Sequence, residues 1–161
     1  MTMSARAGQG EVPPSASLDY GLLNELVGHL LRHAFLRGHQ AFAEAFSGEA
    51  LTPLQFMVLE LVDRNPGVTH RDVAAAMSTA PSVLTTALKP LVAGRLLEQV
   101  GVTGDGRRVG YRLSPEGRAY FHALRPRIDA AERLLLAGLD DAEAETLRLF
   151  LRRMTGRAVE G

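Results

Sequence analysis

The sequence contains no cysteine among its 161 residues. This absence excludes disulfide bonds, thiolate zinc sites, cysteine nucleophiles and cysteine-based redox sensing. No stretch approaches about 18 uninterrupted apolar residues, so we expect no transmembrane helix and no membrane partner. Residues 1–16 are small and polar, contain Pro and Gly, and lack the apolar segment of a secretory signal. We therefore expect a flexible arm at 1–16 and a cytoplasmic protein.

The chain also lacks an excess of either charge, with 18 basic residues, 18 acidic residues and a formal net charge of zero. A neutral total weakens an argument for nucleic-acid binding, but the local distribution of charge matters more than the sum. Residues 80–112 contain five basic residues and two acidic ones. Lys89, which lies in this segment, is the only lysine of the chain. The chain is thus neutral overall with a basic middle.

Helices are predicted on both sides of this middle segment. Ser17 or Asp19 can cap a long N-terminal helix that runs to about Phe46, because a short side-chain oxygen satisfies free N–H groups of the first turn. After the basic segment, Ser114-Pro115 predicts the start of a helix over roughly residues 115–137, and Asp140-Asp141 predicts a final helix.

The middle segment itself predicts a helix–turn–helix. A helix begins at Thr52-Pro53, since Pro at a first helical position loses no hydrogen bond. The next helix begins at Thr69–Asp72, a spacing similar to a capping box, and a turn follows at 78–80. The fourth helix is expected over 81–93. Pro90 lies inside it, so we expect a kink or an early end.

Two strands, at 96–102 and 109–113, follow these helices. The loop at 103–108 contains Gly104 and Gly106, which permit a tight turn between the strands. A helix–turn–helix followed by a basic hairpin has a shape that fits duplex DNA.

The projecting face of the fourth predicted helix is polar. Its members stand at spacings of three and four residues and can reach base edges or phosphates: Ser82, Thr85, Thr86 and Lys89. A plain solvated face is the alternative interpretation. Arg107 and Arg108, at the base of the hairpin loop, would reach a minor groove or its phosphates and favour the DNA-binding interpretation.

Several motifs resemble the MarR family of winged-helix regulators. They are the helix–turn–helix and three short sequences, Leu51-Thr52-Pro53-Leu54-Gln55, Asp105-Gly106-Arg107-Arg108 and Leu113-Ser114-Pro115-Glu116-Gly117. Together they cover about 70 residues in the order and spacing of the family. The chain departs from the family pattern at three positions. Thr86 stands where the family often has Arg, and Pro90 is unusual in this helix. Gly94 lies one position earlier than the glycine of the Leu-Glu-x-x-Gly-Leu sequence that commonly follows the helix in the family.

The resemblance implies a mainly α fold with a small β-hairpin wing. A winged helix-turn-helix domain at 51–113 would lie between dimerisation helices at 17–48 and 114–158. It also implies a homodimer that binds double-stranded DNA at a pseudo-palindromic operator. Apolar side chains near the C-terminus are more numerous than one small domain could cover, in agreement with a dimer: Leu134, Leu135, Leu136, Leu139, Leu147, Phe150 and Leu151.

Such regulators, mostly repressors, typically release DNA when a small aromatic or phenolic acid binds. His33 and Arg37 fall on the apolar arc of the first predicted helix. Arg37 could hold a carboxylate, with Tyr20 as a further candidate; alternatively, His33 and Arg37 pair with acids or carbonyls across the dimer interface. His29 and His33 form an H-x-x-x-H pair, but zinc would need further ligands, so we predict no metal site.

Two other functions are alternatives to a ligand-responsive repressor. One is a winged-helix protein–protein interaction module that has lost sequence-specific DNA binding, which Thr86, Pro90 and the zero net charge favour and the two hairpin arginines oppose. The other is an enzyme. The sequence has no phosphate-binding glycine loop, nucleophile elbow or paired carboxylates in a convincing context, so we predict neither catalysis nor a cofactor.

Overall fold

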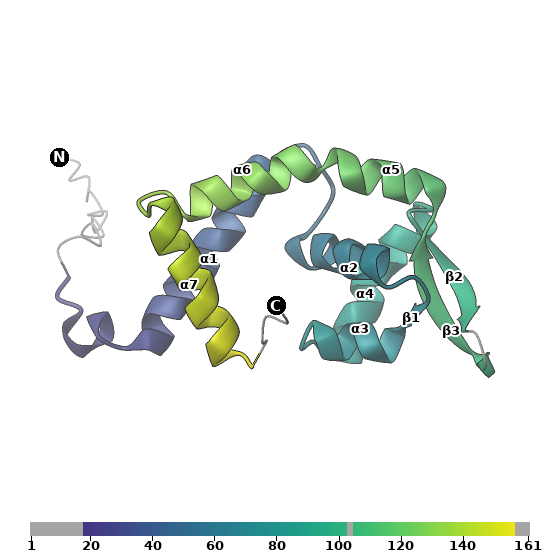
Figure 1. Ribbon diagram of the computed structural model, residues 1–161, viewed down its shortest axis with the longest axis horizontal. Helices are drawn as coiled ribbons and strands as arrows, with labels where there is room; N and C mark the ends of the chain where they lie inside the picture. Colours follow the sequence, from purple (N-terminus) through teal and green to yellow (C-terminus); the bar gives the residue numbers. More distant parts are fainter. Residues whose placement is uncertain (1–17, 103–104, 157–161) are drawn as a thin grey trace, which may run out of the picture. The chain divides into compact units, whose positions relative to one another are not determined.

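The structure, a computed structural model, describes residues 18–102 and 105–156, with the backbone alone at Val102 and 105–108. The fold is mainly helical with one small antiparallel sheet, which confirms the predicted fold class (Figure 1). The chain divides into two units, with the boundary after Phe35. Among the described residues, no helix is long and apolar enough to cross a membrane. The arm predicted at 1–16 lies outside the described residues.

The first unit contains a short 3₁₀ helix, η2 (Gly21–Asn24), and the beginning of helix α1 (Val27–Ala45). The long helix therefore begins later than Asp19, and that prediction was wrong; Ser17 lies outside the described residues. Asp19 Oδ1 accepts a hydrogen bond of 2.9 Å from the backbone N–H of Gly21, which has a φ of +48°. A residue in the left-handed region cannot continue an α-helix, so the chain turns here first.

In the second unit, the first helix after α1 is α2 (Pro53–Arg64). The Thr52 hydroxyl accepts the N–H of Gln55 at 3.2 Å, and Gln55 Oε1 accepts the N–H of Thr52 at 2.9 Å. This reciprocal capping box, together with Pro at the first position, explains why the helix begins where the sequence predicts.

The helix–turn–helix follows as α3 (His70–Ala76) and α4 (Pro81–Ala93). Thr69 caps α3 by accepting the N–H of Asp72 at 3.3 Å. Helix α4 continues through Pro90 to Ala93, so the early end considered for it does not occur. The missing N–H of Pro90 removes one hydrogen bond only, and the Pro90 carbonyl still accepts the N–H of Gly94 at 2.8 Å.

The sheet has three strands in the order β1-β3-β2, namely β1 (Val68–Thr69), β2 (Leu97–Val102) and β3 (Asp105–Leu113). Both pairings are antiparallel, with Val68 opposite Tyr111 and Leu97 opposite Leu113. The sequence pattern missed β1, because two residues show no alternation. It also started β3 four residues late, at Val109.

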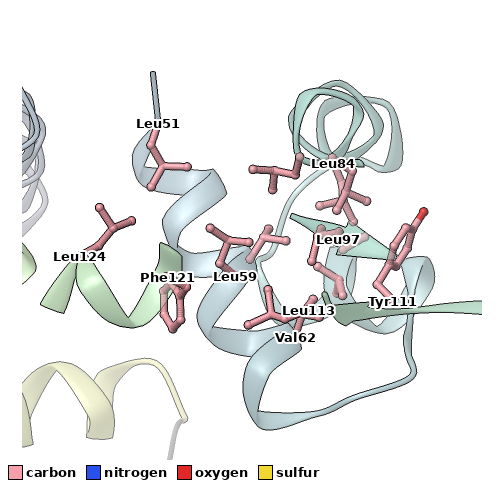
Figure 2. Close-up of a cluster of buried hydrophobic side chains, with 14 of the residues drawn as sticks. Leu51, Leu59, Val62, Leu84, Leu97, Tyr111, Leu113, Phe121 and Leu124 are labelled. Atoms are coloured by element: carbon pink, nitrogen blue, oxygen red, sulfur yellow. The ribbon is translucent and has the colours of Figure 1, made fainter. Parts of the chain in front are cut away.

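The hydrophobic core of this unit lies between α2, α4, α5 (Pro115–Ala123) and the sheet (Figure 2). Six side chains are almost fully enclosed: Val58, Leu59, Val62, Val73, Leu84 and Leu97. Leu113 and Phe121 extend the cluster from β3 towards α5. The core thus joins the helix–turn–helix to the wing.

Three helices complete the chain: α5 (Pro115–Ala123), α6 (Arg125–Leu135) and α7 (Asp141–Met154). The single helix predicted over 115–137 was wrong, because the chain is interrupted at Leu124. Pro126 has no N–H to donate to the carbonyl of the preceding turn, and the buried Leu124 side chain is 3% exposed. The helix is therefore interrupted between α5 and α6 for two reasons: Pro126 cannot donate a backbone hydrogen bond, and the Leu124 side chain is held in the core.

The junction between α4 and β2 contains a strained residue. Arg95 has a φ of +57°, whereas Gly94 has an ordinary φ of −78°. The glycine displaced by one position in the sequence therefore leaves an arginine in the left-handed region, which costs a side-chain-bearing residue about 1–2 kcal/mol.

We predict that Arg95→Gly raises the free energy of unfolding by about 0.5–1 kcal/mol, since glycine adopts this φ without steric cost. Denaturant unfolding measures the change. Arg71→Gly is the matched control, because Arg71 is exposed in α3 at helical φ and its replacement should destabilise by about 1 kcal/mol. Destabilisation of similar size by both substitutions would contradict strain at Arg95.

Candidate DNA-binding surface

Helix α4 has one buried and one exposed face. Leu84, Leu88 and Leu91 are 0%, 3% and 3% exposed, respectively, and enter the core. The side chains predicted to contact DNA are all exposed: Ser82, Thr85, Thr86 and Lys89. The structure thus brings these four residues together on an accessible polar face, and their contact with DNA stays a prediction.

The two threonine hydroxyls on this face turn back towards their own helix. Thr85 Oγ1 donates to the carbonyl of Pro81 at 2.9 Å, and Thr86 Oγ1 donates to the carbonyl of Ser82 at 3.1 Å. Each hydroxyl has a single hydrogen, so neither can donate to a base while these bonds persist. What each side chain still offers outward is its methyl group and an acceptor lone pair.

His70, at the start of α3, also belongs to this surface and was missed by the sequence reasoning. Its Nε2 lies 3.1 Å from Thr85 Oγ1, and its side chain is partly buried. A hollow of about 410 Å³ beside it is lined by residues that include Lys89 of α4 and Tyr111 of β3. The contact joins residues 15 positions apart, so helical spacing alone gives no signal for it.

The wing arginines lie on the third strand of the sheet. Arg107 and Arg108 belong to β3 by their backbone, and their side chains lie outside the described part of the structure. Gly104 also lies outside it. At the base of the hairpin, Arg112 Nε pairs with Glu98 Oε2 at 2.8 Å. Because this pair is exposed, it offsets only part of the charge of Arg112 within the wing.

One buried polar side chain fixes α4 against α2. Gln55 is 6% exposed, and its Nε2 donates to the carbonyl of Ala87 at 3.1 Å. The same amide closes the capping box of α2 through Oε1. Gln55 therefore uses both ends of its amide, one to start α2 and the other to hold the middle of α4.

The residues predicted to bind an effector occupy different places. In the first unit, the ring of His33 packs edge-on against that of His29 at 4.5 Å between centroids, and the ring of Tyr20 lies 6.2 Å from that of His29. In the second unit, Arg37 Nη2 donates to two carbonyls at the end of α6, Leu134 at 3.3 Å and Ala137 at 3.1 Å. Arg37 thus pairs with carbonyls, and these belong to its own chain.

His29 and His33 lie in contact on α1, and a zinc site would need further ligands beside them. Within residues 18–102 and 105–156, no group of three or more potential ligands from His, Cys, Asp and Glu lies close enough to hold an ion.

A cavity of about 250 Å³ lies between α2 and α5 and was not predicted. Aromatic rings of Phe56 and Phe121 line it together with ionisable side chains: Glu60, Asp63, Arg64, His122 and Arg125. Asp63 Oδ2 lies 2.9 Å from His122 Nε2, while its buried Oδ1 has only Arg118 Nη2 at 3.5 Å and no hydrogen bond from the described residues. The cavity combines aromatic walls with charged side chains of both signs, among which Arg64 and Arg125 can pair with the carboxylate of a small aromatic acid.

Near the start of α6, a polar cluster ties the helices to the loop after α1. Tyr120 Oη donates to Glu49 Oε2 at 3.1 Å, and Arg127 Nη1 donates to the carbonyl of Ala45 at 3.1 Å. Burial, and secondarily the hydrogen bond to Glu49, raises the pKa of Tyr120 above its ordinary value. The phenol therefore stays protonated near neutral pH and remains a donor.

Two helices joined by a tight turn, packed on a small antiparallel sheet whose hairpin projects beyond them, define a winged helix-turn-helix protein. Residues 51–108 match the sequence profile of the MarR family. The HTH-type transcriptional repressor NicR of Pseudomonas putida is 30% identical to this chain over 146 residues, which cover 88% of this chain and 91% of that protein. The chain therefore belongs to the MarR family of transcriptional regulators, as its motifs indicate.

Solved structures agree with this assignment. BpsR of Bordetella bronchiseptica, described for regulation of its DNA binding by 6-hydroxynicotinic acid, is 30% identical with a TM-score of 0.75, over 82% of this chain and 94% of that one. The repressor CouR bound to a 23-mer DNA duplex is 27% identical with a TM-score of 0.79, over 86% and 98%. PcaV of Streptomyces coelicolor with its natural ligand is 27% identical with a TM-score of 0.72, over 83% and 94%.

The role of Gln55 gives a testable prediction about this surface. Gln55→Glu keeps the acceptor for the Thr52 N–H but places a carboxylate against the Ala87 carbonyl, so it should lower the free energy of unfolding by about 1–3 kcal/mol. Gln99→Glu makes the same chemical change at an exposed position of β2 and should stay within about 0.5 kcal/mol of the wild type. Urea unfolding of both variants tests this, and equal stabilities would show that the Gln55–Ala87 bond contributes little.

Proposed function

We propose that this chain is a transcriptional repressor that binds a pseudo-palindromic operator as a homodimer and releases it when a small aromatic acid binds. The observation that carries the proposal is the exposed polar face of α4, held outward by the buried leucines behind it. NicR and CouR, which are repressors by name, support the DNA-binding part. BpsR supports the effector class, because its DNA binding is regulated by an aromatic acid.

Apolar side chains left exposed in each unit support the homodimer. In the first unit, Leu22, Leu26 and Leu30 are 67%, 44% and 49% exposed. In the second, α7 exposes Phe150 and Met154 at 52% and 60%. Soluble proteins rarely leave such groups in water, and a two-fold interface between copies would cover them.

A symmetric dimer would use two copies of α4, whose centres would lie about 34 Å apart to enter successive major grooves on one side of the duplex. Arg107 and Arg108 of each wing would contact phosphates or the adjacent minor groove. Such contacts release counterions, so the affinity should fall steeply as the salt concentration rises.

Lys89→Ala tests the DNA-binding part. Losing one phosphate contact in each protomer should weaken binding and reduce the slope of log affinity against log salt by about one per protomer. Fluorescence anisotropy with a labelled duplex, selected from a random library by the wild-type chain, measures both quantities at several salt concentrations. Arg133→Ala is the control, since it removes an exposed cation from α6.

Identical salt slopes for wild type and Lys89→Ala would show that Lys89 makes no phosphate contact in the complex. A wild-type chain that shows no salt-sensitive binding to any duplex would instead favour a winged-helix module that binds proteins.

The carboxylate of the effector has two candidate partners. Arg125 lines the cavity between α2 and α5, and its ion pair with Asp129 at 3.2 Å is exposed and therefore weak. Arg37 is the partner inferred from the sequence, together with His33 and Tyr20. Arg37 Nη2 is engaged by the α6 carbonyls, which leaves Nε and Nη1 as its donors for a ligand. We favour Arg125, because it stands beside the aromatic walls that would hold the ring.

We expect Arg125→Ala to raise the concentration of aromatic acid that releases half of the DNA by about tenfold or more, the effect of losing a charge-assisted hydrogen bond. Arg37→Ala should raise it much less. The probes are 6-hydroxynicotinic acid and hydroxybenzoic acids, with the corresponding amides as uncharged controls. A larger effect from Arg37→Ala would place the carboxylate at Arg37, and unchanged release in both variants would contradict both assignments.

A further inference from the structure

The Thr85 hydroxyl has one hydrogen, and this determines which of its two hydrogen bonds it donates and which it accepts. Thr85 Oγ1 donates its only hydrogen to the carbonyl of Pro81, so in its contact with His70 the oxygen must accept. His70 Nε2 must therefore carry the donated hydrogen. This hydroxyl is held from two sides, by the preceding turn of α4 and by α3.

Threonine in a helix normally divides its population between two χ1 rotamers, because its hydroxyl can bond to carbonyls of the preceding turn in more than one way. Thr86 offers a comparison on the same face, since its hydroxyl bonds to Ser82 and has no second partner among the contacts of the described residues. Thr85 differs by the bond from His70, which is satisfied only when Oγ1 occupies its observed position. With Oγ1 held by the Pro81 carbonyl and by His70, the methyl group is the apolar part of this exposed side chain that remains for contact with a ligand.

We propose that His70 is a positioning residue that fixes Thr85 with its methyl group outward, and that Thr85 thereby reads a thymine in the operator. The C5-methyl of thymine is a feature of the major groove that a threonine methyl recognises by apolar contact. With the hydroxyl outward instead, Thr85 would donate to bases of several kinds. The inference rests on the proposed function, because it presupposes that α4 enters the major groove.

The positioning should not depend on the protonation of His70. The neutral ring with hydrogen on Nε2 and the imidazolium both donate from Nε2. Arg71 of α3, Lys89 of α4 and Tyr111 of β3 line the hollows on either side of the ring, and no carboxylate is among the described residues lining them. Both forms of the ring thus hold Thr85 Oγ1 in the same way.

The experiment is selection of duplexes from a randomised library by the full-length wild-type chain and its variants, followed by sequencing. The wild type should select thymine at one pair of positions related by the two-fold axis. In His70→Phe that preference should fall about fivefold or more, the lower range for a mismatched base pair, while the other positions keep theirs. His70→Gln should restore it, because the amide nitrogen of Gln can donate from a similar place.

Thr85 variants complete the test. Thr85→Ser removes the methyl group and should lose the thymine preference, whereas Thr86→Ser should not affect that same pair. Valine strongly prefers one rotamer in a helix and needs no donor. Adding His70→Phe to Thr85→Val should therefore change nothing further. Thermal unfolding of each variant confirms that it is folded.

Two results would overturn the inference: an unchanged thymine preference in His70→Phe, or an equal loss of preference at every position. A wild-type chain that enriches no duplex would contradict the proposed function itself, and the inference with it. Normal selection by wild type with no specific effect of His70→Phe would contradict the inference alone.

Discussion

The burial of three leucines on one side of α4 is the constraint on which the rest of the surface depends. Leu84, Leu88 and Leu91 enter the core shared by α2 and the sheet. Rotating α4 far enough to bury its polar face would expose these side chains, at a cost of about 1.5–3 kcal/mol each. The outward direction of Thr85 and Lys89 is therefore a consequence of packing. The hydrogen bond from Gln55 to the Ala87 carbonyl also fixes the position of α4 along α2.

Helix α2 connects the two parts of the proposed mechanism. Gln55 contacts α4, while its neighbour Phe56 lines the cavity between α2 and α5. A ligand in that cavity would contact the same turn of α2 that fixes α4. Under the proposed function, the ligand releases DNA by binding more tightly to a dimer geometry in which the two α4 helices no longer match the operator, because only a difference in affinity can shift the equilibrium.

Local signals in the sequence predicted the helix starts at Pro53 and Pro115 and the exposed face of α4, since caps and helical spacing act over a few residues. These local signals could not predict interactions between residues that lie far apart in the sequence. Arg37 meets carbonyls 97 and 100 positions away, and His70 meets Thr85 across the turn. The break at Leu124 depends on Pro126 acting together with an apolar anchor, and β1 exists only because β3 pairs with it. The motifs indicated the family, whereas these contacts are formed only when distant parts of the chain come together in the fold.

Under the proposed function, the exposed face of α4 and the adjacent wing together bind duplex DNA. Titrating the isotope-labelled chain with a selected duplex and following backbone amide resonances by NMR tests it most directly. If this surface binds DNA, the largest shifts fall on residues 82–89 and 105–112, and they shrink as salt is added. Shifts confined to α6 and α7, or insensitive to salt, would contradict it.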